Sequence, residues 1–335
     1  MSKIDTIKAE DLNKFVSYTN GDFFCGNLAY GQREGQGVYM AFSGDKYMGT
    51  WKDDQPNGFG VMDQKTYLLE GDFKKGKAEG WGRMLVKEQE KDIQCYSLQC
   101  GHFHNDKLHG YGRILSKTEG LTEGCFLNGI LEGPGIQTYT KGDFFVGQFA
   151  NGKKNGIGMY FYYNGGYYIG QFKDDSKSGY GYLIDKHDCY YSGSWKNDAK
   201  NGAGFEVYRD GSKYKGFFNG NNKEGSGIML YTQGIKYMGK WKNNKMHGFG
   251  RLDQSNIHPA CGMYENGVLI KAQDVFLKEV IAEVDRAFVP DDFDHWISLS
   301  PDIKSSYLDS FICHEEDLEM ADKYIYPEFL NQSHI

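Results

Sequence analysis

Residues 237–250 read YMGKWKNNKMHGFG, and this pattern recurs along most of the 335-residue chain. It places an aromatic residue, a glycine and a second aromatic residue at Tyr237, Gly239 and Trp241, and a Gly-x-Gly begins nine residues after that glycine. Residues two apart share one face of a β-strand, so the rings and the glycine lie on one face and the intervening residues on the other. The pattern therefore predicts short strands with one aromatic face.

The unit occurs ten times and is followed by a half unit. From Gly101 to Gly262 the anchoring glycines are 23 residues apart, and the earlier steps are 23, 22 and 30 residues, the longest of which holds a polar insert near residues 87–93. Asn-Gly and Asp-Gly pairs between the strands supply the positive φ of hairpin turns. The repeat residues of four well-preserved copies are Tyr47, Gly49, Trp51, Tyr168, Gly170, Phe172, Tyr191, Gly193, Trp195, Tyr237, Gly239 and Trp241.

The composition fits a sheet that needs glycine at defined places. Glycine accounts for 45 residues and proline for only 6, while aromatic residues reach 16%. A glycine in a strand leaves room for a ring on a neighbouring strand to lie across the bare backbone. We therefore expect an all-β repeat fold, in which hairpins stack into an elongated, twisted, single-layer antiparallel sheet whose core face alternates rings and glycines.

The order Tyr-x-Gly-x-Trp, polar loop and Gly-x-Gly resembles the MORN repeat, the membrane occupation and recognition nexus, over residues 22–267. The resemblance implies an elongated, often dimeric scaffold of cilia, cytoskeletal assemblies or membrane junctions, so a homodimer is one expected state. Leu69, Gln99 and Thr122 replace the first aromatic residue in copies three to five, and Leu28 replaces the second in copy one. We expect these copies to be less regular or specialised.

The repeats lie within a chain of four predicted segments. These are a lead-in at residues 1–21, the repeat region at 22–267, a helix at 268–289 and an acidic tail at 290–335. The helix has apolar residues on one face before Pro290 ends it, namely Leu277, Ile281, Val284 and Phe288. We expect it to cap the last strand, whose unpaired edge would otherwise promote aggregation, or to be presented to a partner.

The end of the chain separates in charge from the rest. Residues 272–335 hold 15 Asp or Glu against 4 Lys or Arg, a net charge of −11, whereas the preceding residues carry +4. Large exposed apolar groups oppose solubility, so we expect those of the tail to be anchors for a basic partner protein. The candidate anchors are Phe293, Trp296, Phe311 and Ile312. The alternative is that the tail folds back along the chain's own sheet.

Residues with catalytic or ligand-binding chemistry form no convincing motif. Each Gly-x-Gly lacks the strand–loop–helix context and the trailing Lys-Ser or Lys-Thr of nucleotide sites. Cys95, Cys100, His102 and His104 suggest zinc, but the last three alternate along one predicted strand, which more often forms a solvated sheet face. We expect no catalytic residue, metal or cofactor. A charge of +4 spread over the repeats is also a weak field for nucleic acid.

These features predict a non-enzymatic structural scaffold that binds other proteins of a larger assembly, in an axoneme or another cytoskeletal structure of the cytoplasm. No stretch is long and apolar enough for a signal core or a membrane span. The alternative is a peripheral membrane adaptor that binds anionic phosphoinositides, although such attraction needs clusters of about four to eight basic residues. Its candidate loop lysines are Lys74, Lys75, Lys77, Lys153 and Lys154. A third reading is a regulatory subunit bound to a separate enzyme.

Overall fold

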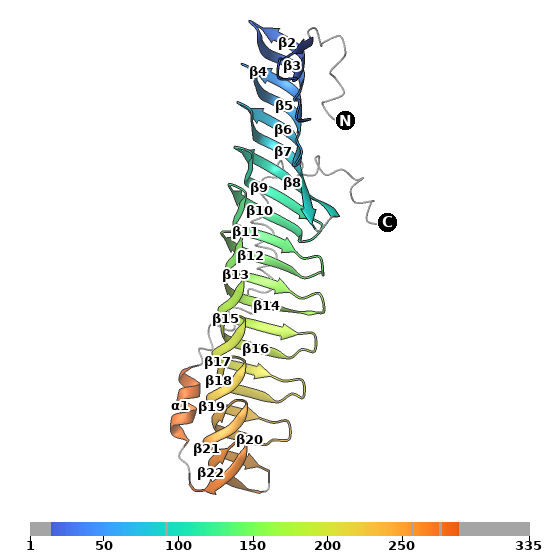
Figure 1. Ribbon diagram of the computed structural model, residues 1–335. Coiled ribbons are helices and arrows are strands. Elements are labelled where there is room, and N and C mark those ends of the chain that lie inside the picture. The colour runs from blue at the N-terminus through green and yellow to red at the C-terminus, as the bar shows by residue number, and fades with distance from the viewer. Residues whose placement is uncertain (1–14, 91–92, 256, 275–276, 288–335) are drawn as a thin grey trace. The chain divides into compact units, whose positions relative to one another are not determined.

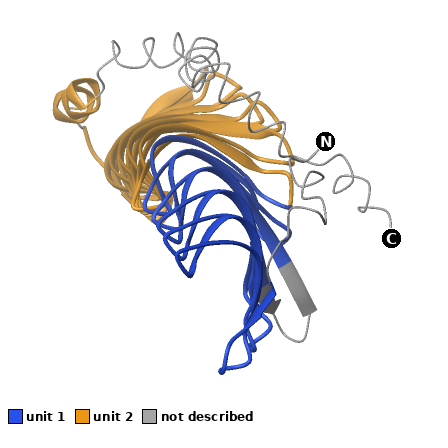
Figure 2. Ribbon diagram, turned by 90° about the horizontal axis from the view of Figure 1, so that it is seen from above, with its two compact units in different colours: residues 1–140, 310–335 blue, residues 141–309 orange. Residues whose placement is uncertain are grey.

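The computed structural model describes residues 15–90, 93–255, 257–274 and 277–287. Antiparallel strands account for most of this part of the chain, and a helix, α1, follows them (Figure 1). The described residues divide into two compact units, unit 1 up to residue 140 and unit 2 from residue 141. Seen from above, the strands of unit 2 bend into an arc, and α1 lies outside that arc (Figure 2). The predicted all-β repeat fold with a C-terminal helix is confirmed.

The described part of unit 1 contains the first eleven strands. They are β1 (Phe15–Ser17), β2 (Phe23–Ala29), β3 (Gln32–Met40), β4 (Lys46–Lys52), β5 (Gln55–Asp63), β6 (Tyr67–Lys74), β7 (Lys77–Glu90), β8 (Ile93–His104), β9 (Lys107–Ser116), β10 (Gly120–Leu127) and β11 (Ile130–Thr138).

The described part of unit 2 contains the remaining strands and the helix. They are β12 (Phe144–Ala150), β13 (Lys153–Phe161), β14 (Gly166–Lys173), β15 (Ser176–Asp185), β16 (Tyr190–Lys196), β17 (Ala199–Val207), β18 (Lys213–Asn219), β19 (Asn222–Leu230), β20 (Lys236–Lys242), β21 (Lys245–Gln254), β22 (Ile257–Glu265), β23 (Val268–Ala272) and α1 (Lys278–Arg286).

Within each unit, consecutive strands pair antiparallel, and the pairing brings repeat glycines opposite one another. Gly193 on β16 lies opposite Gly181 on β15 and Gly204 on β17. The register then shifts between Gly193 and Trp195, which marks a β-bulge. Gly202 has a φ of +100° beside this bulge, a conformation that residues with a Cβ rarely adopt. The first glycine of each Gly-x-Gly therefore serves the backbone.

The second glycine of each Gly-x-Gly serves ring packing. A Cβ atom at Gly204 would lie only 2.5 Å from Cε2 of Tyr191, so the ring covers bare backbone as the sequence predicts. The Tyr191 side chain is 1% exposed and meets the Trp195 and Phe218 rings edge-on, at centroid distances of 5.1 Å each. Such T-shaped pairs add about 0.5–1.5 kcal/mol each to the free energy of apolar burial. We call this ring-and-glycine side the first face of the sheet, and the opposite side the second face.

The divergent copies keep the same pairing but use a different side chain to cover the glycines. Gly101 lies opposite Gly112 although Gln99 has replaced the first aromatic residue. A Cβ at Gly112 would lie 3.1 Å from Cδ2 of Leu108, so a leucine from the following strand occupies the space of the missing ring. Leu131 does the same over Gly124 in the next copy. These copies are therefore specialised rather than irregular.

Two boundaries differ from the prediction, and the predicted insert lies within one hairpin. The lead-in, residues 1–21, contributes β1, which pairs with β2. The predicted helix at 268–289 begins as strand β23, because its β-branched and apolar start completes a hairpin with β22, and α1 begins only at Lys278. The insert near residues 87–93 extends the β7–β8 hairpin, whose pairing continues to Glu90 opposite Ile93.

Candidate binding surface

A continuous row of aromatic rings crosses the second face of unit 2. Adjacent centroids along this row lie 4.3, 6.0, 6.3, 5.5 and 5.9 Å apart. We call these six residues on β12 to β17 the aromatic strip: Phe144, Phe161, Tyr167, Tyr182, Tyr190 and Phe205.

The strip is half-buried and rests on the sheet beneath it. Met159 and Ile169 are buried on the same face, and Phe161 and Tyr167 pack against them. Rings held this way lose little conformational entropy when another chain covers them, and tyrosine adds a hydroxyl that pairs at the rim of an interface. This arrangement suits a protein segment with apolar anchors.

Helix α1 lies on the second face beside the strip, next to β18 and β19 (Figure 1). Glu283 accepts hydrogen bonds from Ser226 and, at 3.0 Å, from Nζ of Lys240. Asp285 accepts one at 3.1 Å from Nζ of Lys215. The Ser226 hydroxyl and then the Lys240 ammonium hold the pKa of Glu283 below its usual value. The helix is thus fastened by charge as well as by its buried apolar residues.

The helix does not cap the sheet in the predicted way. It packs on β18, β19 and β20 instead of covering the last strand. Its buried residues are Leu277, Val280 and Val284, whereas Ile281 is 37% exposed. The buried face of the helix therefore differs from the predicted one, since Val280 is buried in place of Ile281. Phe288 lies outside the described residues.

The second face of unit 1 has a different character across β6 to β10. Cross-strand neighbours there are Glu70, Arg83, Cys100, Arg113 and Glu123, which we call the ionic ladder. Nε of Arg83 donates to Glu70 at 2.8 Å, and Nε of Arg113 lies 2.9 Å from Glu123. The carboxylate of Glu123 also accepts a hydrogen bond from the Tyr111 hydroxyl. Charges across this face are thus neutralised within the sheet.

The surroundings of Cys100 in the ionic ladder test the hypothesis of a zinc site. Cys100 is only 4% exposed, and burial raises the pKa of its thiol to about 11, whereas zinc binds the thiolate. His104 bonds instead to Glu79, at 3.0 Å from Nδ1. Among the residues that the structure describes, no three His, Cys, Asp or Glu side chains converge on a cation site. Cys100 is therefore a packed residue and not part of a solvated face.

The loop lysines considered for lipid binding differ in accessibility. Lys154 is only 12% exposed in its side chain, and its Nζ lies 5.2 and 5.7 Å from the ring centroids of Tyr160 and Phe145. Lys177, Lys200 and Lys223 cover first-face rings in the same way. The remaining candidates, Lys74, Lys75, Lys77 and Lys153, are exposed. Of the five candidate lysines, Lys154 is thus the one whose side chain is not exposed to solvent.

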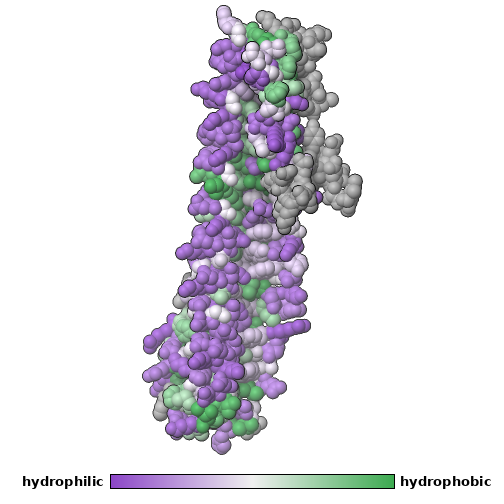
Figure 3. Space-filling model, viewed as in Figure 1, coloured by the Kyte–Doolittle hydropathy of each residue, from purple (hydrophilic) through white to green (hydrophobic). Residues whose placement is uncertain are grey.

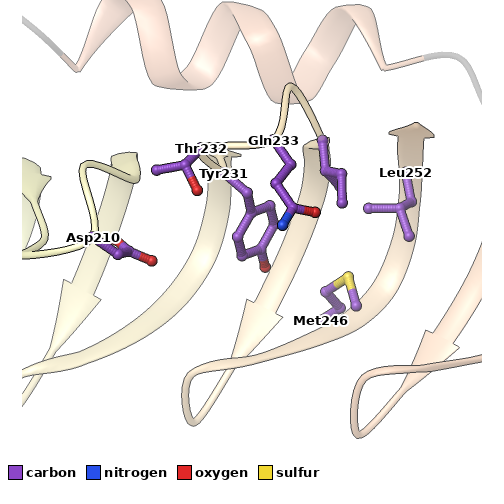
Figure 4. A pocket seen from close by; sticks show the side chains of 7 residues that line it. Asp210, Tyr231, Thr232, Gln233, Met246 and Leu252 are labelled. Atoms are coloured by element: carbon purple, nitrogen blue, oxygen red, sulfur yellow. The ribbon is translucent and has the colours of Figure 1, made fainter. Parts of the chain in front are cut away.

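A shallow pocket opens on the first face of unit 2. It has a volume of about 330 Å³, with Asp210 at one side and Leu252 at the other (Figure 4). Its remaining lining residues are Tyr231, Thr232, Gln233, Ile235 and Met246. No cluster of charged or nucleophilic groups marks a reaction centre among these residues. The pocket therefore gives no support to an enzymatic role.

Other exposed apolar residues are distributed along the described chain. Figure 3 shows a mainly hydrophilic surface with hydrophobic patches near the first and the last strands. The most exposed members are Tyr30, Phe42, Phe15 and Tyr163. They are scattered on turns and edge strands, unlike the continuous aromatic strip.

The aromatic strip was not predicted from the sequence, although the sequence contains a signal for it. Aromatic doublets occur at Phe144-Phe145, Tyr167-Tyr168 and Tyr190-Tyr191, and a doublet in a strand places one ring on each face. Only the first-face rings were assigned a role. The predicted partner-binding residues, Phe293, Trp296, Phe311 and Ile312, lie outside the described residues, so their role stays a prediction.

The MORN repeat family model matches the chain nine times. The matches cover residues 24–46, 47–66, 100–118, 123–144, 145–167, 168–185, 191–213, 214–236 and 237–256. The chain belongs to the MORN-repeat family. MORN repeats are consistent with a protein-binding or membrane-associated scaffold. No helix in the described part of this MORN protein is long and apolar enough to cross a membrane.

Solved structures give weaker likenesses. One is the SAS-4 (dCPAP) TCP domain of Drosophila melanogaster, in complex with a proline-rich motif of Ana2 (dSTIL), at 13% identity and a TM-score of 0.29 over 46% of this chain and 84% of that one. Another is a streptogramin B lyase, at 11% identity and a TM-score of 0.13 over 76% and 68%. Both scores are too low to support a functional comparison. No curated protein matches the MORN chain.

Proposed function

We propose that this MORN protein is a non-enzymatic structural scaffold that binds other proteins through the second face of unit 2. The observation that carries the proposal is the aromatic strip, six adjoining rings held half-buried on a rigid sheet. Aromatic residues are enriched in protein interfaces because a rigid ring contributes a large contact area at low entropic cost. The family resemblance supports an assembly of the axoneme or another cytoskeletal structure.

The partner is a protein with its own apolar anchors. A strip that combines phenylalanine rings with tyrosine hydroxyls favours apolar side chains flanked by polar groups. The acidic tail is a second proposed contact, in which Phe293, Trp296, Phe311 and Ile312 anchor a basic partner. The two contacts need not involve the same protein.

Phosphoinositide binding is the alternative function. Exposed lysines occur at both candidate loops, but in unit 1 Nζ of Lys77 donates at 3.2 Å to Asn105, and in unit 2 Lys154 is engaged by rings. Stable attraction to an anionic surface needs about four to eight clustered cations. The lysines of each loop, taken alone, fall short of that number.

Affinity purification from native cells with two matched variants tests the proposal. Tyr182→Ser with Phe205→Ser disrupts the aromatic strip, whereas Tyr96→Ser with Leu115→Ser alters exposed apolar residues on the second face of unit 1. We expect the strip variant to lose at least one partner that the unit 1 variant retains. Circular dichroism of both variants checks that the sheet remains folded.

Two results would overturn the proposal. Retention of every partner by the folded strip variant would show that binding occurs elsewhere. Sedimentation of the wild-type chain with phosphoinositide vesicles at physiological salt, together with its loss after Lys74→Glu and Lys75→Glu, would favour the membrane adaptor instead.

A further inference from the structure

We infer that the chain's own acidic tail, residues 290–335, docks on the aromatic strip of unit 2. The inference deepens the proposed function and rests on it, because the tail would share the strip with any partner protein. Partner binding would then require the tail to leave the strip. Three observations support this occupant over a partner that binds an open surface: the course of α1, the length of the tail and the distribution of charge.

The first observation is the direction in which α1 crosses the second face. Glu283 bonds to Ser226 on β19 and Lys240 on β20, and two residues later Asp285 bonds to Lys215 on β18. The helix thus advances from β20 towards β18. The next strand in that direction is β17, which carries Phe205, the end of the aromatic strip. Helix α1 therefore ends on the same face as the strip, next to the strand that neighbours β17.

The second observation is reach. The strip crosses six strands, so its length is about 24 Å at a spacing of about 4.8 Å between strands. An extended chain covers about 3.3 Å per residue, so roughly eight residues suffice to follow the strip. Trp296 comes ten residues after Arg286, and Phe311 comes fifteen residues after Trp296. Both side chains can therefore reach the rings without displacing α1.

The third observation is charge. Residues 141–271 contain 18 Lys or Arg against 11 Asp or Glu, a net charge of +7. Residues 1–140 contain 16 against 19, a net charge of −3, and the tail contains 2 against 11, a net charge of −9. The repeats of unit 2 therefore attract the tail while those of unit 1 repel it. The ionic ladder offers no excess cation to the tail, since both of its arginines contact carboxylates.

The carboxylates and the apolar side chains of the tail therefore contribute to docking in different ways. Its carboxylates favour approach to unit 2, and burial of Trp296 and Phe311 against the strip sets how long the contact lasts. The pairs between α1 and the sheet already combine charge with apolar burial in this way.

Hydroxyl-radical footprinting of the full chain tests the inference. The wild-type protein is compared with Trp296→Ala and Phe311→Ala in one chain, and oxidation is measured at Tyr182 and Tyr190. Loss of a covering layer should raise oxidation at both rings by about threefold. Tyr96, which is 40% exposed on the second face of unit 1, provides the internal control and should not change.

A second measurement does not depend on the variant remaining folded. The emission of Trp296, obtained as the difference between the wild type and Trp296→Phe, should be blue-shifted because the docked indole is shielded from water. Water-like emission from Trp296, or equal oxidation of Tyr182 in wild type and the doubly substituted chain, would overturn the inference. Protection of Tyr182 that increases with protein concentration would do so as well, because it would identify a second copy as the source of the tail.

The same variants separate this inference from the proposed function. If the strip variant loses its partner but the tail substitutions leave Tyr182 oxidation unchanged, the strip binds partners and the tail does not dock there. If the tail protects Tyr182 but the strip variant retains every partner, docking is correct and the proposed function is wrong.

Discussion

Across β6 to β10, the second face of unit 1 carries two carboxylate–guanidinium pairs on either side of Cys100, whereas across β12 to β17 the second face of unit 2 carries aromatic rings. The first faces of both units nevertheless follow one plan, with a bulky apolar side chain packed over paired glycines. The plan constrains one face of each strand and leaves the other free to vary. This difference is the basis for proposing that binding occurs on the second face.

The first face also differs between the units in a smaller way. In unit 2 the covering side chain is a ring such as Tyr191, and a lysine lies over the ring. In the divergent copies of unit 1, Leu108 or Leu131 covers the glycines. A branched aliphatic chain moves more easily than a ring enclosed by two other rings. The two solutions should therefore respond differently to added volume.

The largest expected effect comes from glycine substitutions that exploit this contrast. Gly204→Ala places a Cβ 2.5 Å from the Tyr191 ring, whereas Gly112→Ala places one 3.1 Å from the end of Leu108. We expect the free energy of unfolding to fall by about 3 kcal/mol for Gly204→Ala and about 1 kcal/mol for Gly112→Ala. Denaturant titration with hydrogen exchange of the affected hairpins measures both. Equal losses of unfolding free energy would show that the Tyr191 ring and the Leu108 side chain accommodate the added Cβ equally well.

The repeat glycine Gly193 offers a second test of the same packing. A Cβ there would lie 2.5 Å from the carbonyl oxygen of Ala203, so Gly193→Val must push β16 and β17 apart. We expect a loss of about 1–3 kcal/mol, confined to neighbouring hairpins because repeats contact mainly their neighbours. Unchanged hydrogen exchange in β16 and β17 would contradict the assignment of this glycine to the first face.

An intermediate effect is expected from breaking the ionic ladder. Arg83→Met leaves the carboxylate of Glu70, 12% exposed, without that guanidinium, and should destabilise unit 1 by about 1–3 kcal/mol. Adding Glu70→Leu should recover most of the loss, because an apolar pair replaces an ion pair at little cost. Tyr182→Leu in the strip should change stability less. Thermal unfolding followed by hydrogen exchange separates the units. Failure of the double variant to recover would mean that the charges themselves are needed.

The smallest expected effect is the acid response of α1. The pKa of Glu283 is lowered from 4.5 by hydrogen bonds to its charged form, so its contribution is complete above that value and is lost as pH falls through the lowered pKa. Hydrogen exchange in α1 should accelerate only below pH 4.5. Glu283→Gln should abolish this pH dependence, while Glu279→Gln, in the same helix, should preserve it. Acceleration above pH 5 would point to another titrating group.

The sequence was sufficient to predict the first face because the requirement for glycine beneath a ring repeats at a fixed interval. Glycines equivalent to Gly193 and Gly204 therefore recur in all ten complete copies. It was not sufficient for the second face, where Cys100 was expected at a solvated surface but is buried between neighbours on adjacent strands. Cross-strand neighbours on that face depend on register, which one strand alone does not reveal.

The end of the repeats was harder to predict for a local reason. Val268, Leu269 and Ile270 suit either an apolar helix face or a strand, and pairing with β22 decides in favour of the strand. Once the helix starts later, Val280 becomes buried and Ile281 does not. The docking of α1 on β18 to β20 depends on Lys215, Ser226 and Lys240, which lie far from it in the sequence.

The central claim is that the second face of unit 2, and not that of unit 1, is the binding surface. Photo-crosslinking in native cells tests it most directly, with benzoylphenylalanine placed at Tyr182 in one chain and at Tyr96 in another. We expect crosslinks from position 182 to a partner protein or to residues 290–335, and no specific product from position 96. Specific crosslinks from position 96, with none from position 182, would contradict it.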